Sequence, residues 1–172
     1  MKSVIFCIFF ALFLNLVSAH YKLLTPPPRS GAVSSYGAPC GLNYTDVNQT
    51  TISSFPVKGG IVTVDMLHAT AGTLILYFSN DDGKTFAPLT DPTKYNITDK
   101  LGQNLTIPVD LSKVNATVGK QGILQSVFLE GNETSPSNTT LYDCADVNIA
   151  AENTTAPATK SNAGSINAPR FG

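Results

Sequence analysis

The sequence predicts an all-β protein, an immunoglobulin-like or fibronectin III-like β-sandwich with long loops and one disulfide. Short runs of β-branched and aromatic residues alternate with turns rich in glycine, proline and asparagine. No stretch of the sequence has the apolar periodicity of an amphipathic helix. Two cysteines remain after an apolar leader, an even pair that favours one disulfide. Together these features favour two packed sheets over a helical or α/β architecture.

Residues 1–19 have the features of a secretory signal peptide. A lysine supplies the positive charge, residues 4–17 form an apolar run, and Val17 and Ala19 occupy the −3 and −1 positions of a cleavage site. The run is short for a transmembrane helix, so an uncleaved anchor is the less favoured alternative. Cleavage after Ala19 would make His20 the first residue of the mature chain and give it a free α-amino group.

The expected strands follow one another with turns between them. The Asp82-Gly83 pair predicts a hairpin turn, because both positions of a tight primed turn need a positive φ. Pro108 places its strand at a sheet edge, because proline cannot donate a ladder hydrogen bond. Strands are expected at residues 20–24, 51–57, 61–67, 73–78, 85–89, 105–111, 122–130 and 139–147.

The domain organisation is simple. Residues 20–150 are long enough to form one domain with a hydrophobic core. Residues 151–172 are rich in Ser, Thr, Pro and Ala and are expected to be a disordered tail. The small residues at 161–165 are typical of a glycolipid-anchor attachment site, but the hydrophobic segment that should follow is absent from the sequence. The sequence is therefore compatible with two alternatives, a protein attached by a glycolipid anchor and a protein released from the cell.

Charge and cysteine usage limit the classes of partner. The net charge is -1 and only 13% of the residues are charged, which argues against nucleic-acid binding. Cys7 lies in the leader, which leaves Cys40 and Cys144 to form a disulfide in an oxidising compartment. We expect a secreted monomer that binds no nucleic acid.

N-glycosylation sequons are dense along the chain, which supports passage through a eukaryotic secretory pathway. Modified asparagines must face solvent, so these positions are expected in loops and on outer strand faces. The candidate sites are Asn43, Asn48, Asn96, Asn104, Asn115, Asn132, Asn138 and Asn153.

The two histidines of the chain form the candidate metal site. At the mature N-terminus, His20 would offer its α-amine and its ring nitrogen to one metal ion, and the amine has a pKa low enough to give up its proton to a strong Lewis acid. His68, at the end of an expected core strand, would supply a third nitrogen. Three nitrogens suit the tetragonal preference of Cu(II), so we expect one Cu(II) per chain. Taken singly, each histidine could instead be an ordinary solvated residue.

An oxygen ligand is expected from the last strand, where Asp143 and Asp146 are the candidates. Strand alternation places Asp146 on the same face as Cys144, with Asp143 on the other face. If Cys144 points inward to its disulfide, Asp146 leans toward the interior, where a carboxylate must be paired or bound to metal. We therefore expect Asp146 to be the ligand and Asp143 to point into solvent, with Asp143 as the alternative ligand.

These features resemble the fungal copper acquisition factors, cell-surface relatives of the lytic polysaccharide monooxygenases. The resemblance implies an immunoglobulin-like sandwich that binds Cu(II) through a histidine brace, with His20 and His68 as its members and Asp146 as the aspartate. Family members are usually glycolipid-anchored, and polysaccharide oxidation is not their established activity. The residues that carry the resemblance are His20-Tyr21, Pro26-Pro27-Pro28-Arg29, Cys40-Gly41, His68, Cys144-Ala145-Asp146 and the small-residue tail.

We expect a non-catalytic protein that captures copper outside the cell and passes it to an uptake transporter or buffers it at the cell wall. An anionic oxygen beside copper favours Cu(II) over Cu(I), which disfavours oxygen activation. The first alternative is a copper-dependent lytic polysaccharide monooxygenase. It is disfavoured because the chain has no tryptophan and only 9% aromatic residues to build a flat substrate face. The second alternative is a structural cell-wall glycoprotein without metal.

Overall fold

The chain folds into two β-sheets, which confirms the predicted all-β sandwich. The structure is a computed structural model that describes residues 21–29, 36–41, 52–67, 71–96, 103–131 and 136–152. No helix among these residues is long and apolar enough to cross a membrane. The elements are β1 (Tyr21–Thr25), β2 (Ile52–Pro56), β3 (Gly60–Met66), β4 (Ala71–Ser79), β5 (Ala87–Pro88), β6 (Thr93–Asn96), β7 (Asn104–Val109), the 3-10 helix η2 (Leu111–Val114), β8 (Gln121–Gly131) and β9 (Pro136–Ala150).

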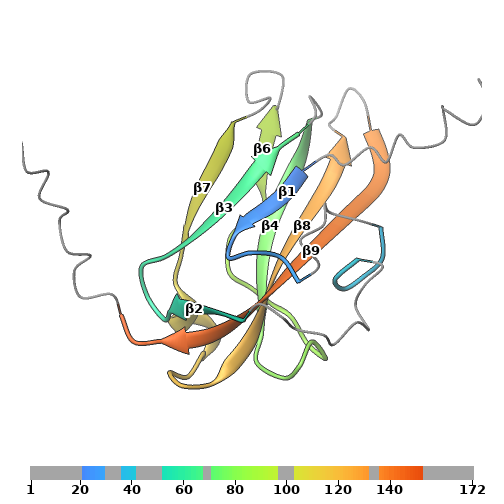
Figure 1. Ribbon diagram of the computed structural model, residues 1–172. Helices are drawn as coiled ribbons and strands as arrows, with labels where there is room; N and C mark the ends of the chain where they lie inside the picture. Colours follow the sequence, from blue (N-terminus) through green and yellow to red (C-terminus); the bar gives the residue numbers. More distant parts are fainter. Residues whose placement is uncertain are drawn as a thin grey trace, which may run out of the picture.

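The two sheets differ in size. The smaller sheet has the order β1-β3-β7 and the larger one the order β2-β9-β8-β4-β5, with β6 also paired to β4. All described pairings are antiparallel except that of β2 with β9, which is parallel. The smaller sheet lies in front of the larger one in Figure 1, with β1 over β8 and β9. Strand β1 therefore packs against β9, the last described strand.

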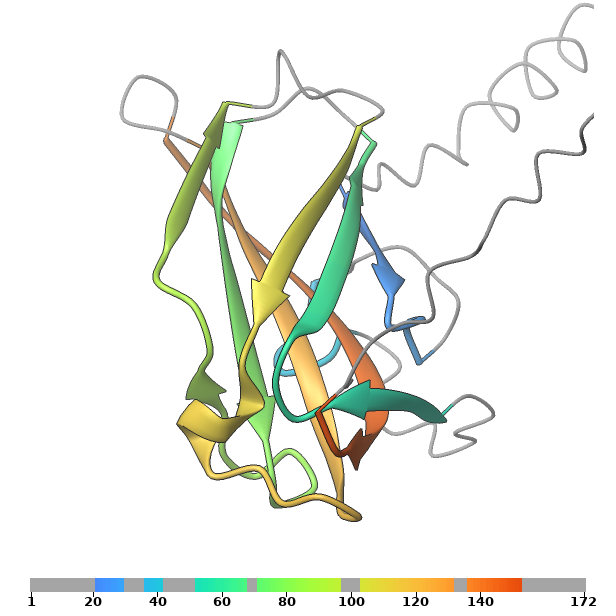
Figure 2. The ribbon, with the colours of Figure 1, turned by 90° about the vertical axis from the view of Figure 1, so that its left-hand side faces the viewer.

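The core lies between the two sheets. On β3, Val62, Val64 and Met66 are buried and alternate with more exposed residues, as a half-buried strand requires. On the other side, β4 contributes Leu74, Leu76 and Phe78 to the same hydrophobic cluster. Figure 2 shows the space between the sheets from the side. Strands β3 and β4 thus each bury the apolar half of an alternating pattern against the facing sheet.

Strand β9 is buried on both faces over residues 143–147. Leu141, Ala145 and Val147 face the core, whereas Cys144 faces outward and is bonded to Cys40. Segment 36–41 covers this outer face, with the Gln125 side chain of β8 donating a hydrogen bond to the Pro39 carbonyl. The predicted disulfide is confirmed, but it lies outside the larger sheet instead of between the sheets.

Two of the turn and edge predictions are confirmed. Strand β7 is an edge strand, and Pro108 pairs there with Ile61. Asp82 and Gly83 both have positive φ, at 57° and 79°, in the connection from β4 to β5. Strand β6 and helix η2 were not predicted. The four residues of β6 are polar and pair only along the start of β4, so they have no apolar alternation to reveal them.

Replacing Gly72 with alanine should destabilise the fold. A Cβ at this position of β4 would overlap the Phe128 ring and lie 2.6 Å from the Leu129 carbonyl oxygen. Overpacking of this kind typically lowers the free energy of unfolding by about 1–3 kcal/mol. Urea denaturation measures the loss. In a Phe128→Leu background the ring tip is gone, so an undiminished cost of Gly72→Ala there would contradict the overlap.

Candidate functional site

The two histidines predicted to hold copper, His20 and His68, lie outside the described residues. The residues beside them are described. Tyr21, which follows His20, pairs with Met66, which lies two residues before His68. The first strand and the end of β3 are therefore neighbours in the smaller sheet.

Tyr21 anchors the start of β1 to the larger sheet. Its hydroxyl donates a hydrogen bond to the Ser126 carbonyl at 2.9 Å and lies 3.1 Å from the Ser126 Oγ. Its ring is fully buried and contacts Phe128 with 5.6 Å between ring centroids. Burial raises the pKa of the Tyr21 hydroxyl well above its ordinary value, and the nearby Asp143 carboxyl raises it further. The residue next to His20 is thus fixed as a neutral hydrogen-bonding group in the core.

Asp143 lies on the core face of β9, which shows that the expected solvent-facing position was wrong. It is 6% exposed, and its Oδ2 accepts a hydrogen bond from the Leu23 N–H at 3.1 Å. Burial raises its pKa from 3.8 to about 7, although the backbone N–H groups of Leu23 and Cys144 and the charge of Lys22 oppose the shift. The carboxyl belongs to a buried polar cluster with Tyr21 and Ser126, because Ser126 pairs with Asp143 across the sheet.

Asp146 shares a face with Cys144, as the alternation predicted, but that face is the outer one and not the interior. Its two oxygens accept hydrogen bonds from the Nε and Nη2 of Arg29, both at 2.7 Å. The two side chains are only 13% and 8% exposed. The Arg29 N–H also donates to the Cys144 carbonyl at 2.8 Å. Arg29 therefore ties the end of the proline run to β9 through its backbone and its side chain.

The N-terminal segment is thus held at three points along the larger sheet, by Tyr21, Leu23 and Arg29. The first two contacts come from the core side of β8 and β9, and the third lies on the outer side. The role of Arg29 was not predicted from the sequence. Chemistry offered a clue to this role, because a buried carboxylate on the last strand needs a cationic partner. Arg29, at the end of the proline run, is a cation that could supply it.

Among the described residues, no group of three or more His, Cys, Asp and Glu side chains is close enough to hold a metal ion. The two expected oxygen ligands are placed apart on opposite faces of β9, as described above. Of the sequon asparagines, Asn104 and Asn115 are described and exposed. Asn96 and Asn138 lie in strands without described side chains, and Asn43, Asn48, Asn132 and Asn153 lie outside the described residues.

Comparison with known proteins gives one family and two structural likenesses. A family model described as "Copper acquisition factor BIM1-like" matches residues 18–166. A lytic polysaccharide monooxygenase from Kitasatospora papulosa has 15% identity and a TM-score of 0.44, with 76% of this chain and 71% of that one covered. A CBM33 protein of Bacillus amyloliquefaciens in complex with Cu(I) has 15% identity and a TM-score of 0.42, with 79% and 81% covered. A search of curated proteins finds no significant match.

Proposed function

The chain belongs to the BIM1-like copper acquisition factor family, and we propose that it is an extracellular protein that binds Cu(II) without catalysing a reaction. The observation that carries this proposal is the register of β1 and β3. Tyr21 pairs with Met66. His20 and His68 lie one and two residues from this pair in the sequence, and the proposal is that they meet at this end of the smaller sheet. After cleavage of residues 1–19, one copper ion would be bound by the amine and ring of His20 and by the ring of His68.

The nature of these donors fits copper. An amine and two imidazoles are nitrogen ligands intermediate between hard and soft. Cu(II) has the highest affinity of the divalent first-row metals for such sites. The hydrogen bonds of Tyr21 and Leu23 hold β1 against the larger sheet and so limit the motion of the residue that follows His20. Because this backbone is already fixed, less conformational entropy is lost when a metal orders the N-terminus.

The oxygen ligand in this proposal is a carboxylate of β9, and the contacts favour Asp143 over the Asp146 expected from sequence. Both Asp146 oxygens accept hydrogen bonds from Arg29, so binding a metal would break a buried ion pair. Asp143 instead contacts the backbone of β1, the strand that begins directly after His20. A carboxylate near the metal would stabilise Cu(II) over Cu(I), which supports copper holding over oxygen activation.

The cellular setting belongs to the same proposal. The leader and the sequons support secretion to the cell wall or to the outer face of the plasma membrane, with glycans on exposed asparagines. The protein would act as a monomer and pass copper to an uptake transporter. Attachment by a glycolipid anchor and release from the cell are both compatible with the small-residue tail.

Acetylating the α-amine of His20 in the mature protein should abolish tight Cu(II) binding. The acetyl group turns the His20 amine into an amide, whose nitrogen lone pair is delocalised into the carbonyl, and it supplies no new amine, so the amine–imidazole chelate is lost. We expect the mature protein to bind one Cu(II) with nitrogen hyperfine coupling in its EPR spectrum. The His68→Ala variant should also bind weakly, whereas one residue added at the C-terminus should change nothing. Stoichiometric tight binding by the acetylated protein would contradict the proposed site.

The two aspartates can be separated by the EPR spectrum of the copper-loaded protein. Asp143→Asn should alter the copper g and hyperfine values, while Asp146→Asn should leave them unchanged in protein that is verified as folded by circular dichroism. The reverse result would restore Asp146 as the ligand. If neither substitution changes the spectrum, copper is bound by nitrogen ligands without a β9 carboxylate, and that part of the proposal fails.

The competing enzymatic function has its own test. The copper-loaded protein would be incubated with ascorbate, hydrogen peroxide and either cellulose or chitin. We expect no oxidised oligosaccharides, because a bound carboxylate disfavours the Cu(I) state that the reaction needs. Their accumulation, and their loss in the His68→Ala variant, would assign the chain to the monooxygenases instead.

A further inference from the structure

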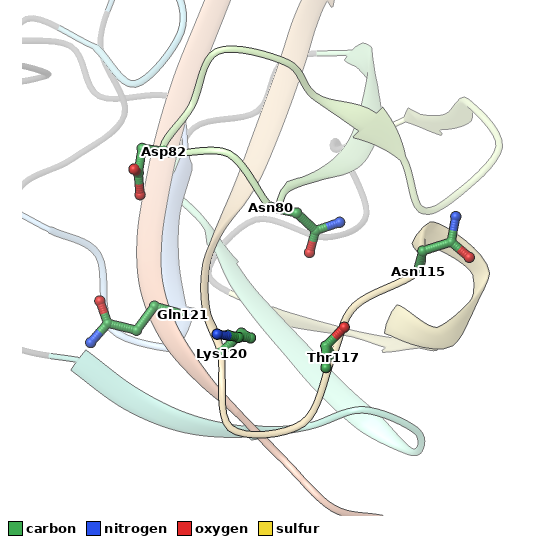
Figure 3. A pocket seen from close by; sticks show the side chains of 6 residues that line it. All are labelled: Asn80, Asp82, Asn115, Thr117, Lys120 and Gln121. Atoms are coloured by element: carbon green, nitrogen blue, oxygen red, sulfur yellow. The ribbon is translucent and has the colours of Figure 1, made fainter.

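We propose that a polar pocket at the base of the sandwich holds the first sugars of an N-linked glycan attached to Asn115. The pocket has a volume of about 480 Å³ and lies between the turn after β4 and the connection from η2 to β8. In Figure 1 these connections lie at the lower end of the sandwich, away from the start of β1. The pocket is lined by Asn80, Asp82, Asn115, Thr117, Lys120 and Gln121, as Figure 3 shows.

The sequon itself forms part of the pocket wall. Asn115 and Thr117 are the first and third residues of an N-x-T sequon, and both line the pocket. Figure 3 places Asn115 at one end of the pocket, with Asp82 and Gln121 at the other. A glycan that begins at Asn115 and bends toward Gln121 would therefore run along the pocket.

The backbone that carries this sequon is well fixed. Asn115 ends η2 in the left-handed conformation, with φ at 58°, and its N–H bonds to carbonyls of the preceding turn. Asparagine tolerates this conformation better than most residues. The Asn80 side-chain amide donates to the Val114 carbonyl at 2.9 Å and so connects the two walls of the pocket. The side chain of Asn115 remains exposed, as attachment of a sugar requires.

The side chains that line the pocket can bond to the polar groups of a sugar, but they are not suited to bind a free sugar tightly. Amides, a carboxylate, an ammonium and a hydroxyl can each bond to sugar hydroxyl or acetamido groups. No aromatic side chain lines the pocket, so it lacks a stacking surface for a free polysaccharide. A covalently attached glycan needs little intrinsic affinity, because attachment holds it at a high effective concentration. This difference favours the chain's own glycan as the occupant.

Attachment is the usual transfer from a lipid-diphosphate-linked oligosaccharide. The Asn115 side-chain nitrogen bonds to C1 of the first sugar and loses one proton, the C1–O bond to the diphosphate breaks, and the lipid diphosphate leaves. This step depends on passage through the secretory pathway and not on copper, so it can be tested separately from the proposed copper function.

Asn104 provides a matched control. It starts a second N-x-T sequon and is exposed at the start of β7, but it is not among the pocket residues. A glycan there has the same chemistry and comparable bulk without a described pocket to hold it. Loss of the Asn104 glycan should therefore leave the base of the sandwich unchanged.

The test uses protein secreted from a eukaryotic host, with glycan occupancy measured by mass spectrometry. Amide hydrogen exchange in peptides covering residues 80–85 and 116–121 should be about fivefold faster in Asn115→Asp and in Thr117→Val than in wild type, the effect of one net hydrogen bond. Asp tolerates the left-handed backbone and Val matches the shape of Thr, so agreement between the two variants isolates the glycan. Asn104→Asp should show no change. An unoccupied Asn115, or equal exchange with and without its glycan, would overturn the proposal.

Discussion

Replacing Asp146 with asparagine is expected to lower the free energy of unfolding by about 3–5 kcal/mol, the usual cost of breaking a buried ion pair by removing one partner. The substitution keeps the size of the side chain but removes the negative charge that pairs with the Arg29 guanidinium. Arg29 is only 13% exposed, so water cannot replace the lost carboxylate effectively. Guanidinium chloride denaturation of the mature protein measures the loss.

The same chain offers a matched control on its surface. Lys58 and Glu152 form an ion pair of nearly the same length, 2.8 Å, but the two side chains are 55% and 50% exposed. Glu152→Gln should therefore have little measurable effect, because water and salt screen an exposed pair. A double variant that replaces Arg29 with Met and Asp146 with Leu should recover much of the stability lost in Asp146→Asn. If Asp146→Asn and Glu152→Gln proved equally mild, the buried Arg29–Asp146 ion pair would not stabilise the fold more than an exposed pair does.

Much of the sandwich follows from local patterns. Strands β3, β4 and β8 carry runs of β-branched and aromatic residues, and Pro108 correctly indicates an edge. The parallel pairing of β2 with β9 could not be predicted, because it joins segments about a hundred residues apart and has no turn to specify it. Local sequence thus predicts strands well but not which distant strands meet.

The orientation of β9 explains why the aspartates were misplaced. Alternation correctly grouped Asp146 with Cys144, but it does not say which group faces the core. Over residues 143–147 both faces of β9 are buried, one by the facing sheet and the other by segment 36–41 and Arg29. A disulfide was assumed to mark the interior, whereas this one ties a loop to the outside of the sheet. The cluster of Tyr21, Ser126 and Asp143 could therefore not be predicted from local sequence, because it depends on how strands of both sheets pack together.

Asp143 should make the copper-free protein less stable as the pH rises from about 4 to about 7. Its pKa is raised from 3.8 to about 7 in the folded state, chiefly by burial. Between these values the folded protein retains a proton that the unfolded chain has lost, so the unfolded state binds fewer protons and stability falls with increasing pH. Each unit of pKa shift corresponds to about 1.4 kcal/mol, which gives a loss of about 4 kcal/mol by pH 8. Below pH 4 both states are protonated and the effect vanishes.

Asparagine at position 143 isolates this contribution, because its carbonyl can still accept the Leu23 N–H without carrying a charge. Urea denaturation of both proteins from pH 4 to pH 8, with chelator present, gives the difference in unfolding free energy at each pH. The two proteins should be about equally stable at pH 4, and Asp143→Asn should become the more stable one as the pH passes 5, 6 and 7. Other titrating groups cancel in the difference. A difference that stays constant across this range would mean that the Asp143 carboxyl ionises near its ordinary pKa, and that the space between β1 and β9 is better solvated than its burial indicates.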